Sequence, residues 1–171
     1  MSMLKDNNKP ITVKYIWDKD TFTKGSKSLY MDMLRNSPKR FIGWFFIGLS
    51  QFGLVAFYKK GAFGLLMLST VFLLYWYVLR WPIRKIFLLK SFKNSPLKDK
   101  NIEIIFDNNY ILIDNIKLKY KDIPRVLIEK AGYLFYYQDN FFFIPKESIK
   151  EEEKFIKMIK KRISSTIDRR Q

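Results

Sequence analysis

The chain of 171 residues contains no cysteine and no histidine. Without cysteine there is no disulfide and no thiol nucleophile, and without either residue there is no zinc site of the Cys/His type. The lack of histidine removes the usual acid–base group near neutral pH and any Ser-His-Asp triad. The seven glycines form no Walker loop, no GxGxxG and no GxSxG motif. We therefore predict no catalytic, cofactor-binding or metal-binding residue, and a protein that is not an enzyme.

Acidic residues are absent between Asp32 and Asp99, and that stretch holds two apolar runs at residues 41–58 and 62–79. Each run of 18 residues would span about 27 Å as a helix, close to the hydrocarbon thickness of a bilayer. Backbone polar groups in lipid must be satisfied within their own segment. The runs therefore predict a transmembrane helical hairpin at residues 41–81, with two buried helices of a soluble core as the alternative.

Basic residues predict the orientation of this hairpin. Nine Lys and Arg residues precede it, two lie in the turn Lys59-Lys60-Gly61, and seven lie in residues 80–100. The positive-inside rule places both termini in the cytoplasm and, for a bacterial protein, the hairpin in the inner membrane. The formal net charge is +16. Attraction to membrane lipids explains this charge, so we expect no nucleic-acid partner.

The segments that flank the hairpin also have regular patterns. Residues 1–40 predict an N-terminal strand, at residues 11–17, followed by a helix that begins at Asp18. Residues 82–97 have helical spacing with interleaved basic residues, which predicts a linker helix at the membrane interface, bent at Pro82. The basic residues in this segment and just before it are candidate contacts for anionic lipid or a partner: Arg80, Arg84, Lys85, Lys90 and Lys93.

Polar side chains inside the apolar runs predict a contact between the two helices. Gln51 and Ser69 each lie nine residues from Lys60, so the two side chains are expected at one depth. An amide that faces lipid is costly, so we expect Gln51 to bond Ser69 or Thr70. The alternative is a polar site for a toxin or an ion.

Residues 98–171 predict a small β-rich cytoplasmic domain closed by a helix. Short alternating segments separated by turn residues predict a meander that curls into a sheet or partial barrel. The strands are expected at residues 101–106, 110–113, 116–120, 126–130, 133–138 and 141–144. Ser148 and Glu151 predict a capping box for the final helix, whose apolar stripe covers the sheet. The aromatic run at residues 135–143 is expected in the core.

Three lysines alternate along one predicted strand of this domain. Lys117, Lys119 and Lys121 share one face, opposite the apolar residues of the same segment. The pattern fits an ordinary solvated sheet face or an anion-binding face, which Arg125 or Lys146 would join.

A short motif in the last part of the chain comprises Ile123, Val126, Gly132-Tyr133 and Ile144-Pro145-Lys146, followed by the final helix. Together with the order of segments, this motif resembles the YcxB-like family of bacterial proteins. Tyr120 stands where the family usually has tryptophan. The resemblance implies an α+β membrane protein, with a transmembrane helical hairpin and a cytoplasmic pleckstrin-homology-like sheet or partial barrel, residues 98–171, closed by a C-terminal helix. It implies no activity.

Three functions remain open at this point. The chain is either a membrane-anchored module that binds a protein partner or anionic lipid, an immunity protein against a toxin, or an accessory subunit of a membrane complex. A neighbouring toxin gene would favour immunity, and stoichiometric co-purification would favour the complex. Oligomeric state is not indicated by the sequence.

Overall fold

The computed structural model describes residues 10–114, 116–138 and 140–170. These residues form two compact units. The first comprises the described residues up to Ser28 and those from Ser95 onward, and the second runs from Leu29 to Asn94. The strand that precedes the hairpin belongs to the same unit as the β-rich region that follows it.

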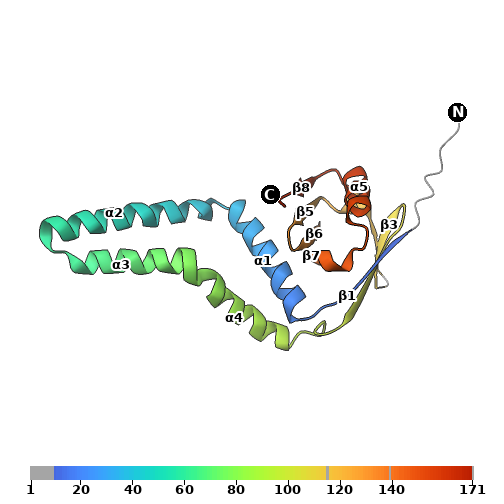
Figure 1. Ribbon diagram of the computed structural model, residues 1–171, viewed down its shortest axis with the longest axis horizontal. Coiled ribbons are helices and arrows are strands. Elements are labelled where there is room, and N and C mark those ends of the chain that lie inside the picture. The colour runs from blue at the N-terminus through green and yellow to red at the C-terminus, as the bar shows by residue number, and fades with distance from the viewer. Residues whose placement is uncertain (1–9, 115, 139, 171) are drawn as a thin grey trace. The chain divides into compact units, whose positions relative to one another are not determined.

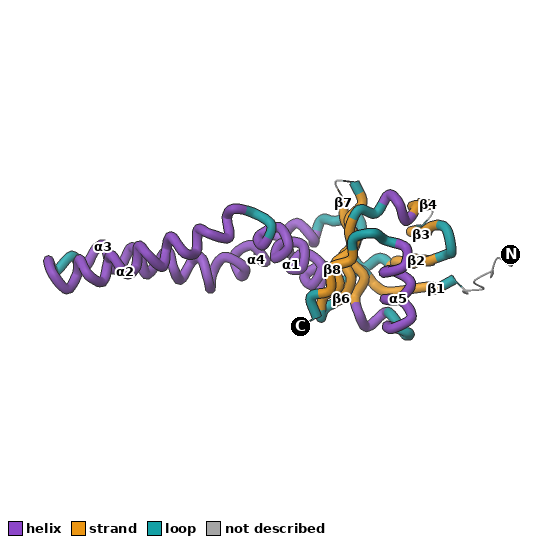
Figure 2. Tube along the Cα trace, turned by 90° about the horizontal axis from the view of Figure 1, so that it is seen from above, coloured by secondary structure: helices purple, strands orange, loops and turns teal. Residues whose placement is uncertain are grey.

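The second unit is a helical hairpin with helical flanks. Helix α1 (Lys19–Arg35) enters it, and α2 (Ile42–Lys60) and α3 (Phe63–Leu74) lie side by side (Figures 1 and 2). A π-helical turn, Tyr75–Leu79, joins α3 to α4 (Arg80–Lys93). Two helical stretches, Pro38–Lys60 and Phe63–Lys93, are long and apolar enough to cross a membrane, and only 11% and 6% of their apolar windows is buried. Two helices capable of spanning a bilayer thus lie where the sequence predicts them.

The second helix of the hairpin changes direction before Pro82. The Arg80 N–H donates to the carbonyl of Tyr75, five residues back, instead of to the carbonyl four residues back. A proline ring clashes with the carbonyl four residues before it, which here belongs to Val78 inside the widened turn. The predicted bend is therefore present, but the π turn absorbs it one turn earlier, as Figure 1 shows between α3 and α4.

Small residues allow the two hairpin helices to approach closely. A Cβ atom on Gly53 would lie 2.8 Å from Ser69 Oγ, and Ser69 is fully buried. Nearby, the rings of Phe46 and Phe72 stack with centroids 5.3 Å apart. The turn is closed by Gly61, whose φ of 62° lies in the left-handed region that glycine tolerates best. Close contact at a small-residue crossing is typical of helices that pack in membranes.

The first unit contains two sheets. Sheet A has the order β1-β2-β3-β4 and is entirely antiparallel. Its strands are β1 (Ile11–Ile16), β2 (Asn101–Phe106), β3 (Tyr110–Ile113) and β4 (Ile116–Lys119). Val13 pairs with Ile104, and both side chains are buried. The Trp17 N–H donates to the Lys100 carbonyl at 2.8 Å, so the residue after β1 lies beside the residue before β2.

Sheet B has the order β7-β6-β5-β8. Its strands are β5 (Arg125–Glu129), β6 (Gly132–Tyr137), β7 (Asn140–Pro145) and β8 (Thr166–Asp168). The six strands predicted after the hairpin are present, with shifts of at most one residue at their ends. Strand β8, which runs parallel to β5, was not predicted. Both sheets have free edges, so the described strands form two open sheets and no closed barrel.

One hydrophobic core joins the two sheets and helix α5 (Glu152–Arg162). Phe155 lies at its centre with no exposed area. Its ring meets Phe106 of sheet A edge-on at 4.9 Å and Tyr133 of sheet B at 5.1 Å. Edge-to-face packing of this kind adds to the stabilisation from burial. Of the aromatic run predicted to lie in the core, Phe135 is fully buried here and Phe143 is fully buried on the other face of sheet B, whereas Phe141 is exposed.

The predicted capping box is wrong. Ser148 lies in a 3-10 turn, Lys146–Ser148, and its hydroxyl donates to the Pro145 carbonyl. Helix α5 begins three residues later than the box requires, and Glu151 precedes it without a side-chain cap. Glu152 and Glu153 occupy the first turn instead, where negative charge complements the helix dipole.

The other face of sheet B is covered by the first half of α1. Leu127, Leu134 and Phe143 point away from the shared core and are nevertheless fully buried. A Cβ atom on Gly25 would lie 2.9 Å from the Cβ of Phe143, so the helix approaches the strand closely. The Ser28 hydroxyl donates to Glu129 Oε2 at 2.5 Å. Glycine inside a helix, unfavourable for the helix itself, is thus explained by packing.

Candidate functional site

The predicted lysine face lines an open cleft of about 520 Å³ in the first unit. The cleft lies at the β3–β4 hairpin, the 3-10 turn Tyr120–Asp122 and the end of α5. Its lining includes four cationic side chains and no carboxylate: Asn108, Asn109, Tyr110, Lys117, Lys119, Tyr120, Lys121 and Arg162. We call it the basic cleft. A cationic concave surface without acidic residues raises the local concentration of anions.

Arg162 forms the fixed wall of the basic cleft. Its Nη1 donates to the Asp107 carbonyl at 2.6 Å and to the Tyr120 hydroxyl at 2.9 Å, and its Nη2 donates to Asn108 Oδ1 at 2.7 Å. Its guanidinium also lies 5.0 Å from the Tyr120 ring centroid. None of these acceptors carries a charge, so they orient the guanidinium without neutralising it.

Tyr120 contributes a buried hydroxyl to the hydrogen bonds that position Arg162. Its side chain is buried, and its hydroxyl donates to the Asp107 carbonyl at 2.7 Å. Burial raises the pKa of Tyr120, although the hydrogen bond and charge of Arg162 oppose that rise. The phenol therefore remains neutral at physiological pH and adds no negative charge to the cleft.

The three lysines form the exposed cationic rim of the cleft. All three are exposed, and Lys117 Nζ lies 5.0 Å from the centroid of the Tyr110 ring. Because β4 is an edge strand of sheet A, the lysines also discourage other strands from pairing with it. Edge protection accounts for Lys117 and Lys119 on the strand, but Lys121 and Arg162 lie beyond it and face the same cleft.

Arg125 and Lys146 do not join the basic cleft, contrary to the predicted alternative. The Arg125 guanidinium lies 4.4 Å from the Tyr136 ring centroid, on sheet B. The Lys146 Nζ forms an ion pair with Glu152 Oε2 at 2.9 Å. Arg162 takes the place that the sequence had assigned to them. From the sequence alone, Arg162 is recognisable only as a basic residue in the last turn of the final helix.

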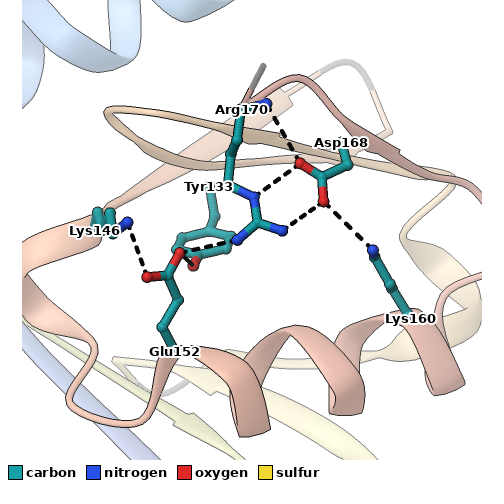
Figure 3. A network of polar contacts seen from close by, with 6 residues as sticks. All are labelled: Tyr133, Lys146, Glu152, Lys160, Asp168 and Arg170. Carbon is teal, nitrogen blue, oxygen red and sulfur yellow. Dashed lines mark hydrogen bonds and ion pairs between the residues drawn. The ribbon is translucent and has the colours of Figure 1, made fainter.

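Lys146 belongs to a polar network that fastens the end of the chain (Figure 3). Arg170 binds Asp168 through two hydrogen bonds, at 2.9 and 2.7 Å, and contacts Glu152 at 3.3 Å. Tyr133 donates to the same carboxylate at 3.1 Å. The network joins β8, α5 and β6, and it explains why the short strand β8 stays in the sheet.

The network lowers the pKa of both carboxyl groups. Hydrogen bonds from Arg170 hold the pKa of Asp168 far below its ordinary value, and the Lys146 hydrogen bond lowers the pKa of Glu152. Burial, followed by the Glu152 contact, raises the pKa of Tyr133. The two acids are therefore charged and the phenol neutral at pH 7.

We predict that acid weakens the first unit through this network. A carboxyl group with a depressed pKa in the folded state stabilises the fold above its unfolded pKa and loses that contribution as the pH falls. The melting temperature of the purified chain should therefore fall as the pH drops below about 5. The Asp168→Asn variant should be less stable at pH 7 and show a smaller further loss at pH 3. An equal acid response in both proteins would contradict this role.

The basic residues that follow the hairpin lie in the second unit and differ in environment. Lys85, Lys90 and Lys93 are exposed along α4. The guanidinium of Arg80 lies 4.0 Å from the Trp76 ring centroid, and that of Arg84 lies 4.8 Å from the Tyr30 ring centroid. The predicted cationic segment thus divides into solvent-facing lysines and two arginines held by aromatic rings.

The predicted bond between Gln51 and the second helix is not formed among the described residues. Gln51 is exposed, and the hydroxyls of Ser69 and Thr70 both donate to the Leu66 carbonyl, at 2.9 and 2.8 Å. Serine and threonine commonly satisfy their hydroxyls in this way within helices. Gly53, two residues after Gln51, makes the close approach to Ser69.

The part of the chain that the structure describes holds no group of three or more His, Cys, Asp or Glu side chains placed to bind a metal ion. Compared with known protein families, curated proteins and solved structures, the chain has no match. The site must therefore be interpreted from its own geometry, which offers cations, hydrogen-bond donors and aromatic rings to an anionic group.

Proposed function

We propose that this chain is a non-enzymatic protein of the bacterial inner membrane, whose basic cleft binds the surface of anionic lipid. The observation that carries the proposal is the convergence of Lys117, Lys119, Lys121 and Arg162 on one cleft without a carboxylate. Each Lys or Arg near an anionic bilayer contributes about 1 kcal/mol. The two helices of spanning length supply the anchor.

The proposal extends to orientation and fold. Both termini are assigned to the cytoplasm because basic residues are most numerous on both flanks of the hairpin. Two open sheets that share a core with a single helix support a pleckstrin-homology-like arrangement of the first unit. Membership of the YcxB-like family stays a prediction from the sequence.

The proposal is tested on the full chain, because the structure places β1 and the first half of α1 in the same unit as residues 95–170. The protein is reconstituted in nanodiscs of phosphatidylcholine alone or with phosphatidylglycerol, and lysine acetylation is followed by mass spectrometry. We expect Lys117, Lys119 and Lys121 to react more slowly in the anionic discs, and high salt to reverse the protection.

Lys130 serves as the internal control, since it is exposed and does not line the cleft. Its reactivity should be the same in both kinds of disc. Equal reactivity of the three cleft lysines in neutral and anionic discs would overturn lipid binding by the cleft. A protein partner would then be the better interpretation of the same cationic surface.

A further inference from the structure

Two adjoining clefts in the second unit share the side chains of Tyr30 and Arg80. The first, of about 580 Å³, is also lined by Arg84, Ile83 and Phe87. The second, of about 570 Å³, is lined by further residues that include Arg35, Arg40, Trp76 and Trp81. Neither lining contains an acidic residue. Two arginines therefore line the first cleft and three line the second, with Arg80 common to both.

Two polar atoms at the shared wall are buried without a partner. Arg80 Nη1 and the Tyr30 hydroxyl have no hydrogen-bond acceptor or donor among the described residues. Burying such groups unpaired is costly, and buried polar atoms in folded proteins are nearly always bonded. Burial raises the pKa of Tyr30, so its hydroxyl keeps its proton and is available to donate. The Tyr30 hydroxyl and the charged Arg80 Nη1 are thus two buried donors without an acceptor among the described residues.

Aromatic rings hold the cationic groups in place. The Arg80 guanidinium lies 4.0 Å from the Trp76 centroid and 5.3 Å from the Tyr30 centroid. Arg84 lies 4.8 Å from the Tyr30 centroid, and Trp81 stacks on that ring at 5.6 Å. Stacking orients the planar guanidinium groups and leaves their N–H edges for a ligand. That fork geometry matches the oxygens of a phosphate.

From these features we propose that Tyr30, Arg80 and Arg84 form a binding site for the phosphate of a single anionic phospholipid. The inference rests on the proposed membrane insertion of the hairpin. Arg80 directly follows the apolar run that ends at Leu79, where lipid headgroups lie if the run crosses the bilayer. Ile83 and Phe87 in the same lining are exposed, and they offer an apolar surface to the acyl chains. A free phosphate ion has no apolar part that could contact that surface.

The site is distinct from the basic cleft in both location and chemistry. The cleft presents flexible, exposed lysines, which suit a diffuse anionic surface. The Tyr30 site presents a partly buried Arg80, an exposed Arg84 held against the Tyr30 ring, and a neutral phenol, which suit one stoichiometric headgroup. The two sites lie in different units, so the variants of one leave the other intact.

The experiment is native mass spectrometry of the full chain in detergent, with added phosphatidylglycerol or phosphatidylcholine. We expect one tightly retained phosphatidylglycerol per chain and at least about tenfold weaker retention by Arg80→Gln or Arg84→Gln. Lys85→Gln and Lys90→Gln remove the same charge from the same helix outside the clefts, and should retain the lipid as the wild type does. An equal loss of phosphatidylglycerol retention in these controls would show that the lipid is held by general charge attraction, and would overturn the proposed site.

Tyr30→Phe provides a second variant that keeps the ring and its stacking on Trp81. It should weaken retention of phosphatidylglycerol while leaving the melting temperature nearly unchanged, and unchanged retention in both Tyr30→Phe and Arg80→Gln would overturn the proposal. Full displacement of the lipid by inorganic phosphate would identify a phosphate-ion site and overturn the lipid assignment. Triple replacement of Lys117, Lys119 and Lys121 by glutamine should not affect retention, which separates this result from failure of the basic cleft.

Discussion

Replacing Gly53 by leucine should separate the two helices of the hairpin. A Cβ atom at this position would lie 3.2 Å from the Leu65 carbonyl oxygen and from the Leu66 Cα, and these backbone atoms cannot rotate away. The helices would have to move apart and lose the buried contact at Ser69. Since the chain has no native cysteine, a cysteine pair at Phe46 and Phe72 reports the approach. We expect efficient cross-linking with Gly53 and little with leucine.

Gly48→Leu is the matched control for this experiment. A Cβ atom at Gly48 meets no other atom within 4 Å, although the residue lies on the same helix. Leucine there adds the same volume and hydrophobicity without a clash. The cross-linking yield should remain at the level of the parent protein. Equal yields for Gly53→Leu and Gly48→Leu would show that the close crossing does not hold the hairpin together.

Truncation of Phe155 to alanine should cause the largest loss of stability in the first unit. The side chain is fully buried and contacts rings from both sheets, so its removal leaves a cavity where the two layers meet. Phenylalanine-to-alanine changes at such sites cost about 3–5 kcal/mol of unfolding free energy. Denaturation of the full chain in detergent, followed by near-ultraviolet circular dichroism, measures the loss.

Phe141→Ala tests whether burial is the cause. Phe141 is 38% exposed at the edge strand β7, and its removal leaves no enclosed space. We expect its effect to be within about 1 kcal/mol, as is usual for surface substitutions. A loss as large as that of Phe155→Ala would contradict the assignment of the core to the space between the sheets and α5.

Local patterns in the sequence predicted most of the elements. The two apolar runs are long enough to be read without knowledge of their neighbours, and the alternation in residues 101–113 identifies β2 and β3 within their observed limits. Periodicity also predicted an apolar stripe on the last helix, and Phe155 and Ile159 of that helix are fully buried. These signals depend only on residues a few positions apart.

The features that the sequence did not reveal depend on distant partners. The pairing of β1 with β2 joins residues separated by the whole hairpin. Strand β8 is three residues long, too short for a pattern, and it exists because β5 offers an edge and Arg170 fastens its end. Arg162 meets the basic cleft only because α5 ends next to the β2–β3 turn. The prediction that Gln51 bonds Ser69 used only their equal expected depth in the bilayer. In the structure the residue that closely approaches Ser69 is Gly53.

The pairing of β1 with β2 also sets an order of events during synthesis. Residues 11–16 leave the ribosome first, but their partners at residues 101–106 follow only after both hairpin helices have been made. Sheet A therefore lacks a strand until the hairpin has emerged. A nascent chain stalled before residue 101 should carry β1 unpaired and open to proteases, and a chain released after β4 should protect it. Synthesis of both hairpin helices thus precedes completion of the first unit, so the hairpin is complete before the basic cleft exists.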